Sequence, residues 1–176
     1  MATILQGWVL AEQGEGEAGI AQMRQGLSAY HAVGSELWRP YFLALLAQAH
    51  GEVGQAEEGL PALAEALAIV ERTGERWWEA EVYQVQGELF LQQAASRGYQ
   101  AEEEAEACFQ QARDLAYHQQ AKSLELRAAM SLARLWQQQG KRAEARTLLA
   151  PVYGWFTEGF DTADLQDAKA LLEALA

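Results

Sequence analysis

Residues 47–66, AQAHGEVGQAEEGLPALAEA, decide the fold, because they contain one complete helix–turn–helix junction. Ala47, a small residue, is followed three positions later by the larger His50. Gly54 then ends the first helical pattern, and an alanine- and glutamate-rich segment follows it. Antiparallel helices in close contact need small residues where their backbones approach and large residues beside them. The second segment has such an order of small, large and small: Gly59, Leu63 and Ala66.

The same unit occurs four times along the chain. Gly14, Gly54 and Gly140 each end a helical pattern, and the first two lie 40 residues apart. A repeat of this kind predicts a solenoid, in which each helix pair buries its exposed face against the next. In the first helices a small residue precedes a larger one: Gly7 and Leu10, Ala47 and His50, Gly87 and Phe90, Ala133 and Trp136. The second helices carry Gly19, Met23 and Gly26; Gly59, Leu63 and Ala66; Ala105, Phe109 and Ala112; Ala145, Leu149 and Val152.

The composition also indicates an all-α domain. Only three prolines occur in 176 residues, and alanine, leucine, glutamate and glutamine, which are good helix formers, dominate. No run of alternating β-branched residues between turns indicates a strand. We therefore expect nine helices in one domain. The domain covers residues 1–176. The four repeats cover about residues 1–34, 35–74, 75–120 and 121–158, and a capping helix covers residues 162–175.

Three local features modify this plan. The third repeat has six extra residues near 96–100, a polar stretch that indicates a longer surface turn. Pro61 and Pro151 lie inside second helices, where we expect bends and a break before Pro151. The last helix has Asp161 and Thr162 as N-cap candidates, and it lacks a partner helix, which indicates a cap. Its apolar face consists of Leu165, Ala168, Leu172 and Leu175.

The pattern resembles the tetratricopeptide repeat, which has a small residue in its first helix, a turn glycine, and small–large–small spacing in its second helix. The resemblance covers nearly the whole chain. It implies a right-handed α-solenoid of four helix hairpins plus a C-terminal capping helix, and a concave groove, lined by the first helices, that binds partners. The period is about 40 residues instead of 34. The family's early tryptophan is replaced by Thr3, Leu43, Tyr83 and Ala129.

Residues 76–176 resemble a more particular group, the carboxy-terminal region of large bacterial signalling proteins. These proteins join a class III nucleotide cyclase or a DNA-binding region to a signal-transduction ATPase. The most telling part is the aromatic stretch Tyr153, Trp155 and Phe156, which precedes EGFD at 158–161. The resemblance implies a regulatory arm for a catalytic domain elsewhere. The abrupt start, ATILQGWVLA, also indicates a piece of a larger protein.

By resemblance to the tetratricopeptide repeat, one face of the first helices is the partner-binding groove. It mixes aromatic, amide and charged groups, which suits recognition of a peptide or a loop. Its glutamates come early and its arginines late, so a partner would meet an acidic portion and then a basic one. The alternative is a solvated face of an acidic protein. The groove residues are Trp8, Glu12, Tyr41, Gln48, Glu52, Trp77, Glu81, Gln84, Glu88, Arg127, Arg134 and Gln138.

The tryptophans divide into two groups. Trp78 aligns with Trp38 and Leu124, and a large apolar residue at one place in three repeats indicates packing. Trp136 also occupies a core position by this alignment. Trp77 shares a helix face with the acidic groove residues of its repeat. It therefore either lines the groove or is half-buried against the loop of the preceding repeat.

The sequence contains no recognisable catalytic, cofactor or metal site. The formal charge of −12 disfavours nucleic acid and anionic membranes as partners. No nucleophile accompanies the histidines, and His50 occupies a packing position, which indicates a satisfied interior imidazole. Cys108 lies in an apolar helical pattern as an inert small hydrophobe, and a single cysteine is consistent with the cytoplasm.

We therefore expect a non-catalytic module that binds a protein or peptide, including the ATPase or cyclase domain of a parent chain. The alternative function is a small-molecule sensor with its ligand in the groove near Trp77 and Tyr41. A deep apolar pocket with convergent polar groups would favour the sensor, and a shallow open groove would favour a protein partner. Self-association into a homo-oligomer stays open.

Overall fold

The structure is a computed structural model that describes all residues from 1 to 176, and it contains helices and no strands. It has ten helices, whereas the sequence predicts nine, because a short helix follows α5. The all-α prediction is confirmed. In chain order the helices are α1 (Ala2–Glu12), α2 (Gly16–Ala32), α3 (Arg39–Glu52), α4 (Ala56–Thr73), α5 (Glu79–Gln92), α6 (Ala94–Arg97), α7 (Tyr99–His118), α8 (Lys122–Gln138), α9 (Arg142–Tyr153) and α10 (Ala163–Ala174).

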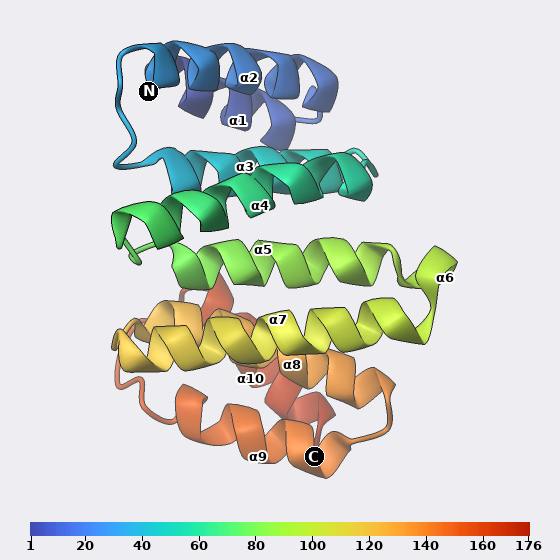
Figure 1. Cartoon of the computed structure of the whole chain (residues 1–176). Coiled ribbons are helices and arrows are strands. Elements are labelled where there is room, and N and C mark those ends of the chain that lie inside the picture. The colour runs from blue at the N-terminus through green and yellow to red at the C-terminus, as the bar shows by residue number, and fades with distance from the viewer.

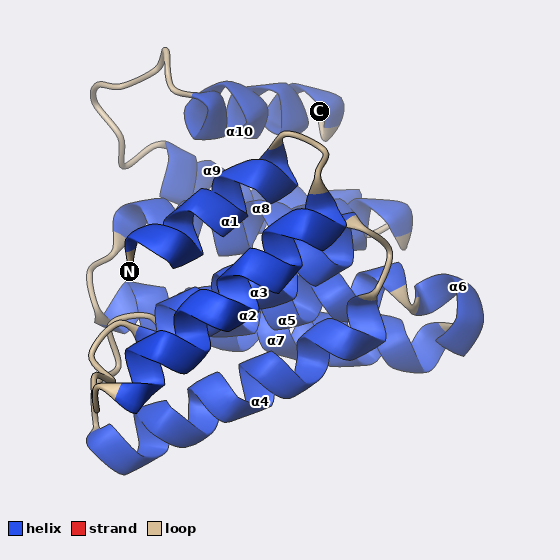
Figure 2. Ribbon diagram, turned by 90° about the horizontal axis from the view of Figure 1, so that it is seen from above, coloured by secondary structure: helices blue, strands red, loops and turns tan.

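The long helices pack as four hairpins, which are α1 with α2, α3 with α4, α5 with α7, and α8 with α9. The hairpins follow one another in chain order along the stack (Figure 1). α10 packs against α8 and α9 at the far end. In Figure 2 it lies on the same side of the stack as α1, away from α4. The chain is thus an α-solenoid of four hairpins with a C-terminal helix.

The first hairpin depends on a close approach of two backbones. A Cβ atom at Gly19 would lie 2.5 Å from the carbonyl oxygen of Gly7, and one at Gly7 would lie 2.7 Å from the carbonyl oxygen of Gly19. Both distances are far below van der Waals contact, so only glycine fits. In the second hairpin a Cβ at Gly59 would lie 2.9 Å from the carbonyl oxygen of Ala47. The small residues therefore mark helix contacts, as the repeat pattern predicts.

Apolar side chains from both helices of each hairpin form the core. The largest cluster joins α1 to α5 and includes the buried side chains of Met23, Phe42 and Leu63. A second cluster joins α8, α9 and α10 around Leu126 and Leu149. Large residues of the repeat pattern thus fill the space beside the small ones, which stabilises each hairpin against its neighbours.

His50 is an interior residue with both ring nitrogens satisfied. Its side chain is 2% exposed. Nδ1 lies 3.0 Å from Oε1 of Gln55, and Nε2 lies 3.1 Å from Nη2 of Arg24. Because the amide oxygen accepts and the guanidinium donates, Nδ1 carries the proton. The prediction of a satisfied interior imidazole is confirmed.

The prediction of a longer surface turn in the third repeat is only partly correct, and the predicted break before Pro151 is wrong. The extra residues of the third repeat form the one-turn helix α6 before Gly98 redirects the chain, so the insertion is not only a turn. α4 runs through Pro61 to Thr73, and α9 runs through Pro151 to Tyr153, so no break precedes Pro151. Both prolines are exposed. The helices therefore lose a backbone donor on their solvent side while their packed faces keep them continuous.

α10 covers the core at the end of the stack, as the sequence predicts. Leu165, Ala168 and Leu171 are buried against the last hairpin, and Leu172 is only partly buried. Thr162 occupies the N-cap position with an extended backbone, but its hydroxyl does not cap the helix. It donates instead to the carbonyl oxygen of Gly159 at 2.7 Å. The Thr162 hydroxyl therefore stabilises the turn before α10, and does not cap the helix as the sequence predicts.

Replacing Gly19 with alanine should destabilise the protein by about 2 kcal/mol, because the new methyl group overlaps the α1 backbone. The higher helix propensity of alanine offsets this by at most about 1 kcal/mol. Urea denaturation followed by circular dichroism measures the change. Gly154→Ala is the control, since Gly154 is exposed and has helical φ and ψ. Equal stability of Gly19→Ala and the wild type would refute the close contact.

Candidate functional site

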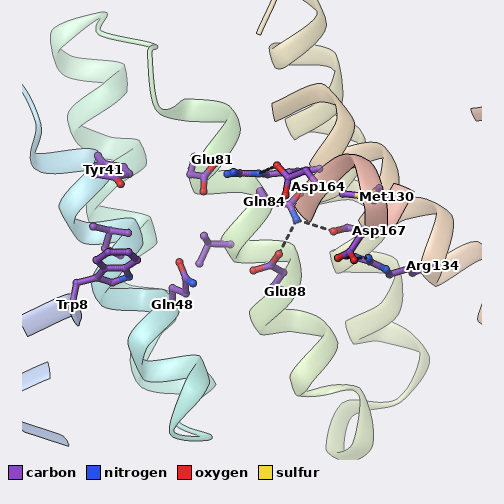
Figure 3. Close-up of a pocket in the computed structure, with 14 residues that line it drawn as sticks. Trp8, Tyr41, Gln48, Glu81, Gln84, Glu88, Met130, Arg134, Asp164 and Asp167 are labelled. Carbon is purple, nitrogen blue, oxygen red and sulfur yellow. Dashed lines mark hydrogen bonds and ion pairs between the residues drawn. The ribbon is translucent and has the colours of Figure 1, made fainter. Parts of the chain in front are cut away.

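The concave face of the stack contains a cavity of about 360 Å³, formed by α1, α3, α5, α8 and α10. In Figure 3, side chains from these five helices converge on it. α5 lies between α1 and α3 on one side and α8 and α10 on the other. Nine of the fourteen residues that line it are polar. They are Trp8, Tyr41, Leu45, Gln48, Glu81, Gln84, Val85, Glu88, Arg127, Met130, Ser131, Arg134, Asp164 and Asp167.

The structure brings together eight of the twelve residues predicted for the groove. Glu12 and Glu52 do not line the cavity but lie beside one another near its edge, where Gln48 donates to Glu52 at 3.3 Å. Burial and the nearby Glu12 raise the pKa of the Glu52 carboxyl. Gln138 lies beyond Arg134, in a separate depression. The eight are Trp8, Tyr41, Gln48, Glu81, Gln84, Glu88, Arg127 and Arg134.

Trp77 is not part of this cavity, so its predicted place on the groove face is wrong. Trp77 lies in the turn before α5, which begins at Glu79. Helical spacing therefore does not predict the direction of its side chain. Its side chain is 75% exposed, so the alternative of half-burial is also wrong. Together with Leu37, Trp38 and Trp78 it lines a separate apolar depression.

Trp38 and Trp78 pack against one another, as predicted, but Trp38 lies at the surface. The Trp78 ring lies 4.3 Å from the ring of Tyr41 and 5.4 Å from that of Trp38, between centroids. Trp38 is 39% exposed, because it covers Trp78 from outside. Trp136 is partly buried between two core clusters, and its indole N–H donates to Glu106 at 3.0 Å.

One wall of the cavity is acidic and comes from α5. Glu81, Gln84 and Glu88 are spaced three and four residues apart and therefore lie on one helix face. Gln84 Nε2 donates to Oε1 of Glu88 at 2.8 Å and to the hydroxyl of Ser131 on α8, also at 2.8 Å. Loss of solvation raises the pKa of the Glu81 carboxyl and that of Glu88. The Glu81 side chain is half-buried, whereas the Glu88 side chain as a whole is exposed.

The opposite wall consists of α8 and α10, and its cations are already paired. Nε of Arg127 lies 2.8 Å from Oδ2 of Asp164, and Nη2 of Arg134 lies 3.7 Å from Oδ2 of Asp167. The predicted change from an acidic to a basic portion is therefore wrong. With Glu81, Glu88 and the two aspartates against two arginines, the lining has a formal charge of −2.

Asp164 and Asp167 are site residues that sequence reasoning missed. The sequence assigns α10 only the role of a cap. The available signal was their spacing of three residues, which puts both carboxylates on one face of that helix. Nothing in the repeat period shows that this face turns toward Arg127 and Arg134, because α10 has no counterpart in the other repeats.

No histidine or cysteine lines the cavity, and the hydroxyl of Ser131 accepts a hydrogen bond from Gln84. Burial raises the pKa of the Cys108 thiol to about 11, so the reactive thiolate is scarce at neutral pH, and this residue does not line the cavity. No group of three or more histidine, cysteine, aspartate or glutamate side chains is arranged to ligate a metal ion. None of the ten helices combines the length and apolar character that crossing a bilayer requires.

Comparison with solved structures gives the fold. A Podosopora anserina protein assigned as a kinesin light chain, with nearly identical TPR-like repeats, superposes with a TM-score of 0.73 at 18% identity, over 99% of this chain and 83% of that one. A single-residue variant of those repeats superposes with a TM-score of 0.74 at 16% identity, again over 99% of this chain and 83% of that one. No protein-family model and no curated protein matches the sequence. The chain is thus a TPR-like α-solenoid.

The two adjacent tryptophans should differ sharply in their effect on stability. Trp78→Ala removes a ring that packs against Tyr41 and should cost about 2 kcal/mol or more. Trp77→Ala changes an exposed side chain and should stay within about 0.5 kcal/mol of the wild type. Urea denaturation of both variants measures the difference. Similar losses for the two would show that Trp77 packs in solution.

Replacing Glu81 with glutamine should stabilise the protein at pH 7. Glu81 is half-buried and its pKa is raised by loss of solvation, so the ionised side chain disfavours the folded state above that pKa. The penalty disappears as the pH falls below the unfolded value near 4.5. The gain in unfolding free energy should therefore shrink between pH 7 and pH 4.5.

Urea denaturation at several pH values tests this dependence. Glu158→Gln removes the same charge from an exposed loop position and should show no such trend. A Glu81→Gln variant that is less stable than the wild type at pH 7 would indicate a well-solvated carboxylate.

Proposed function

We propose that this chain is a non-catalytic interaction module that binds a segment of a protein partner in the concave cavity. The observation that supports this function best is the convergence of side chains from five helices on one polar cavity. Such a surface offers hydrogen-bond donors and acceptors along a length that suits an extended segment or a loop. The TPR-like fold of the chain is compatible with this function and does not itself identify the partner.

A protein segment fits the cavity better than a small apolar ligand. Pockets for small molecules are mostly apolar with a few polar groups. Here nine of fourteen lining residues are polar, and four carboxylates are among them. Trp8 and Tyr41 supply aromatic surface at only one side (Figure 3). We therefore favour protein recognition over the small-molecule sensor.

We further propose that the module is the regulatory arm of a larger bacterial signalling protein in the cytoplasm, and that it binds the ATPase or cyclase domain of that protein. The support is the resemblance of residues 76–176, with Tyr153, Trp155 and Phe156, to the carboxy-terminal region of such proteins. Sequencing of the flanking DNA tests this context. Flanking reading frame without ATPase or cyclase motifs would refute it.

Filling the cavity should weaken binding whatever the chemistry of the partner. Peptides selected from an unbiased displayed library on the wild-type protein provide the ligands, and isothermal titration calorimetry measures their affinity. Gln48→Trp places a large ring in the cavity and should weaken binding at least about tenfold, equivalent to about 1.4 kcal/mol.

Gln111→Trp is the matched control, because Gln111 is exposed on α7 and does not line the cavity. It should leave the affinity unchanged. Selected peptides that bind Gln48→Trp as tightly as the wild type, or a selection that enriches no peptide, would contradict the proposed function.

A further inference from the structure

The first hairpin has an apolar face on which no other helix packs. α1 contacts only α2 and α3, and in Figure 1 no helix lies beyond α1 and α2 at their end of the stack. Leu5 and Val9, four residues apart on one side of α1, are 38% and 43% exposed. Together with Gln6 and Leu10 of α1 and Gln22 of α2, they line a depression of about 500 Å³. We call this surface the N-terminal end face.

The residue that corresponds to Val9 in the third repeat contacts the hairpin before it. This residue is Leu89 of α5, two positions after the small residue of its repeat. Leu89 is 1% exposed. A Cβ atom at Gly51 of α3 would lie 2.7 Å from one of its methyl groups, and a Cβ atom at Gly59 of α4 would lie 2.8 Å from the other. Val9 has the same place in its repeat, but no hairpin covers it.

Leu10 shows the same relation. It corresponds to His50 of α3 and to Trp136 of α8. His50 lies 3.1 Å from Arg24 of α2, and the Trp136 indole donates to Glu106 of α7 at 3.0 Å. Both residues thus contact the second helix of the preceding hairpin. The N-terminal end face therefore consists of positions that form a contact between hairpins elsewhere in the stack, which indicates that another helix hairpin covers it.

The N-terminal end face is uncharged although the protein is strongly acidic. No residue of α1 before Glu12 carries a charge. Glu17 and Arg24, the acidic and the basic residue of α2, bond to Gln55 and His50 of the second hairpin instead. Two copies of the chain, each with a formal charge of −12, therefore repel one another least where these faces meet. Depletion of charged residues is also characteristic of the core of protein interfaces.

We propose that the N-terminal end face binds the same face of a second copy of the chain, so that two stacks join in a two-fold symmetric dimer. Since α10 covers the opposite end of the stack, a head-to-tail contact is blocked and like faces meet. Leu5 and Val9 of the two copies then bury one another. The amides of Gln6 and Gln22 both donate and accept, so they complement the same groups of the other copy. This inference goes beyond the proposed function, because the N-terminal end face shares no residue with the concave cavity.

The size of the N-terminal end face determines the expected affinity. α2 has 17 residues and is therefore about 25 Å long, and two helices side by side are about 20 Å wide. A dimer would thus bury about 500 Å² per copy, or about 1,000 Å² in total, which is at the lower end of specific interfaces. We therefore expect a reversible dimer with a Kd on the order of 10 μM.

Sedimentation velocity tests the dimer, at protein concentrations from about tenfold below to about thirtyfold above this Kd. The weight-average mass should rise from 19.5 kDa toward twice this value and no further, because a two-fold contact is closed. Leu5→Glu should raise the Kd at least about tenfold, since it puts like charges into an apolar contact. Leu37→Glu is the matched control, because Leu37 is an exposed leucine in the separate tryptophan-lined depression. It should leave the Kd unchanged.

Gln6→Glu is a second, milder variant, because it changes the charge of an exposed side chain and hardly its shape. It should weaken the dimer by about fivefold through repulsion between the two copies. Gln111→Glu makes the same change on the exposed side of α7 and should leave the Kd unchanged. Circular dichroism and urea denaturation of the four variants show whether each keeps the helical fold.

A protein that stays monomeric at every concentration would overturn the inference and leave the N-terminal end face to a partner other than a second copy. A dimer that both Leu5→Glu and Gln6→Glu leave intact would also overturn it. Dissociation by Leu37→Glu would place the interface at the tryptophans instead, and growth beyond a dimer would exclude the two-fold contact. Gln48→Trp, which fills the concave cavity, should dimerise like the wild type, so this result is independent of the proposed function.

Discussion

The close contact between the backbones of paired helices is the constraint on which the structure depends. Where Gly7 meets Gly19, no side-chain carbon fits between the two helices, and Ala47 with Gly59 repeats this contact in the second hairpin. The contact fixes which faces of the two helices meet, and the large residues beside it fill the core. Because the hairpins stack in one direction, the first helices are left side by side on the concave face (Figure 1).

This arrangement explains why the cavity combines residues that are distant in sequence. α5 contributes the acidic wall, and the bond from Gln84 to Ser131 joins it to α8. α10 then contributes two aspartates from the opposite side. The C-terminal helix thus has two physical roles, because its apolar face covers the end of the core and its polar face determines the charge of the cavity.

The repeat period was sufficient to predict the fold and much of the cavity, and the errors occur where the period stops applying. Glu81, Gln84 and Glu88 were predictable because they follow helical spacing inside a repeat. Trp77 was misplaced because it precedes the helix that the spacing describes. Asp164 was missed because α10 lies outside the repeat, so its direction depends on tertiary packing that no periodicity describes.

Comparison of equivalent positions shows how the acidic wall keeps its charge. The residues that correspond to Glu81 and Glu88 in the fourth repeat are Arg127 and Arg134, which face the same cavity. Without α10, these guanidinium groups would be the nearest cations available to the two glutamates. Their pairing with the aspartates of α10 leaves the glutamates with only partial electrostatic compensation. The C-terminal helix therefore helps to set the charge of the concave cavity.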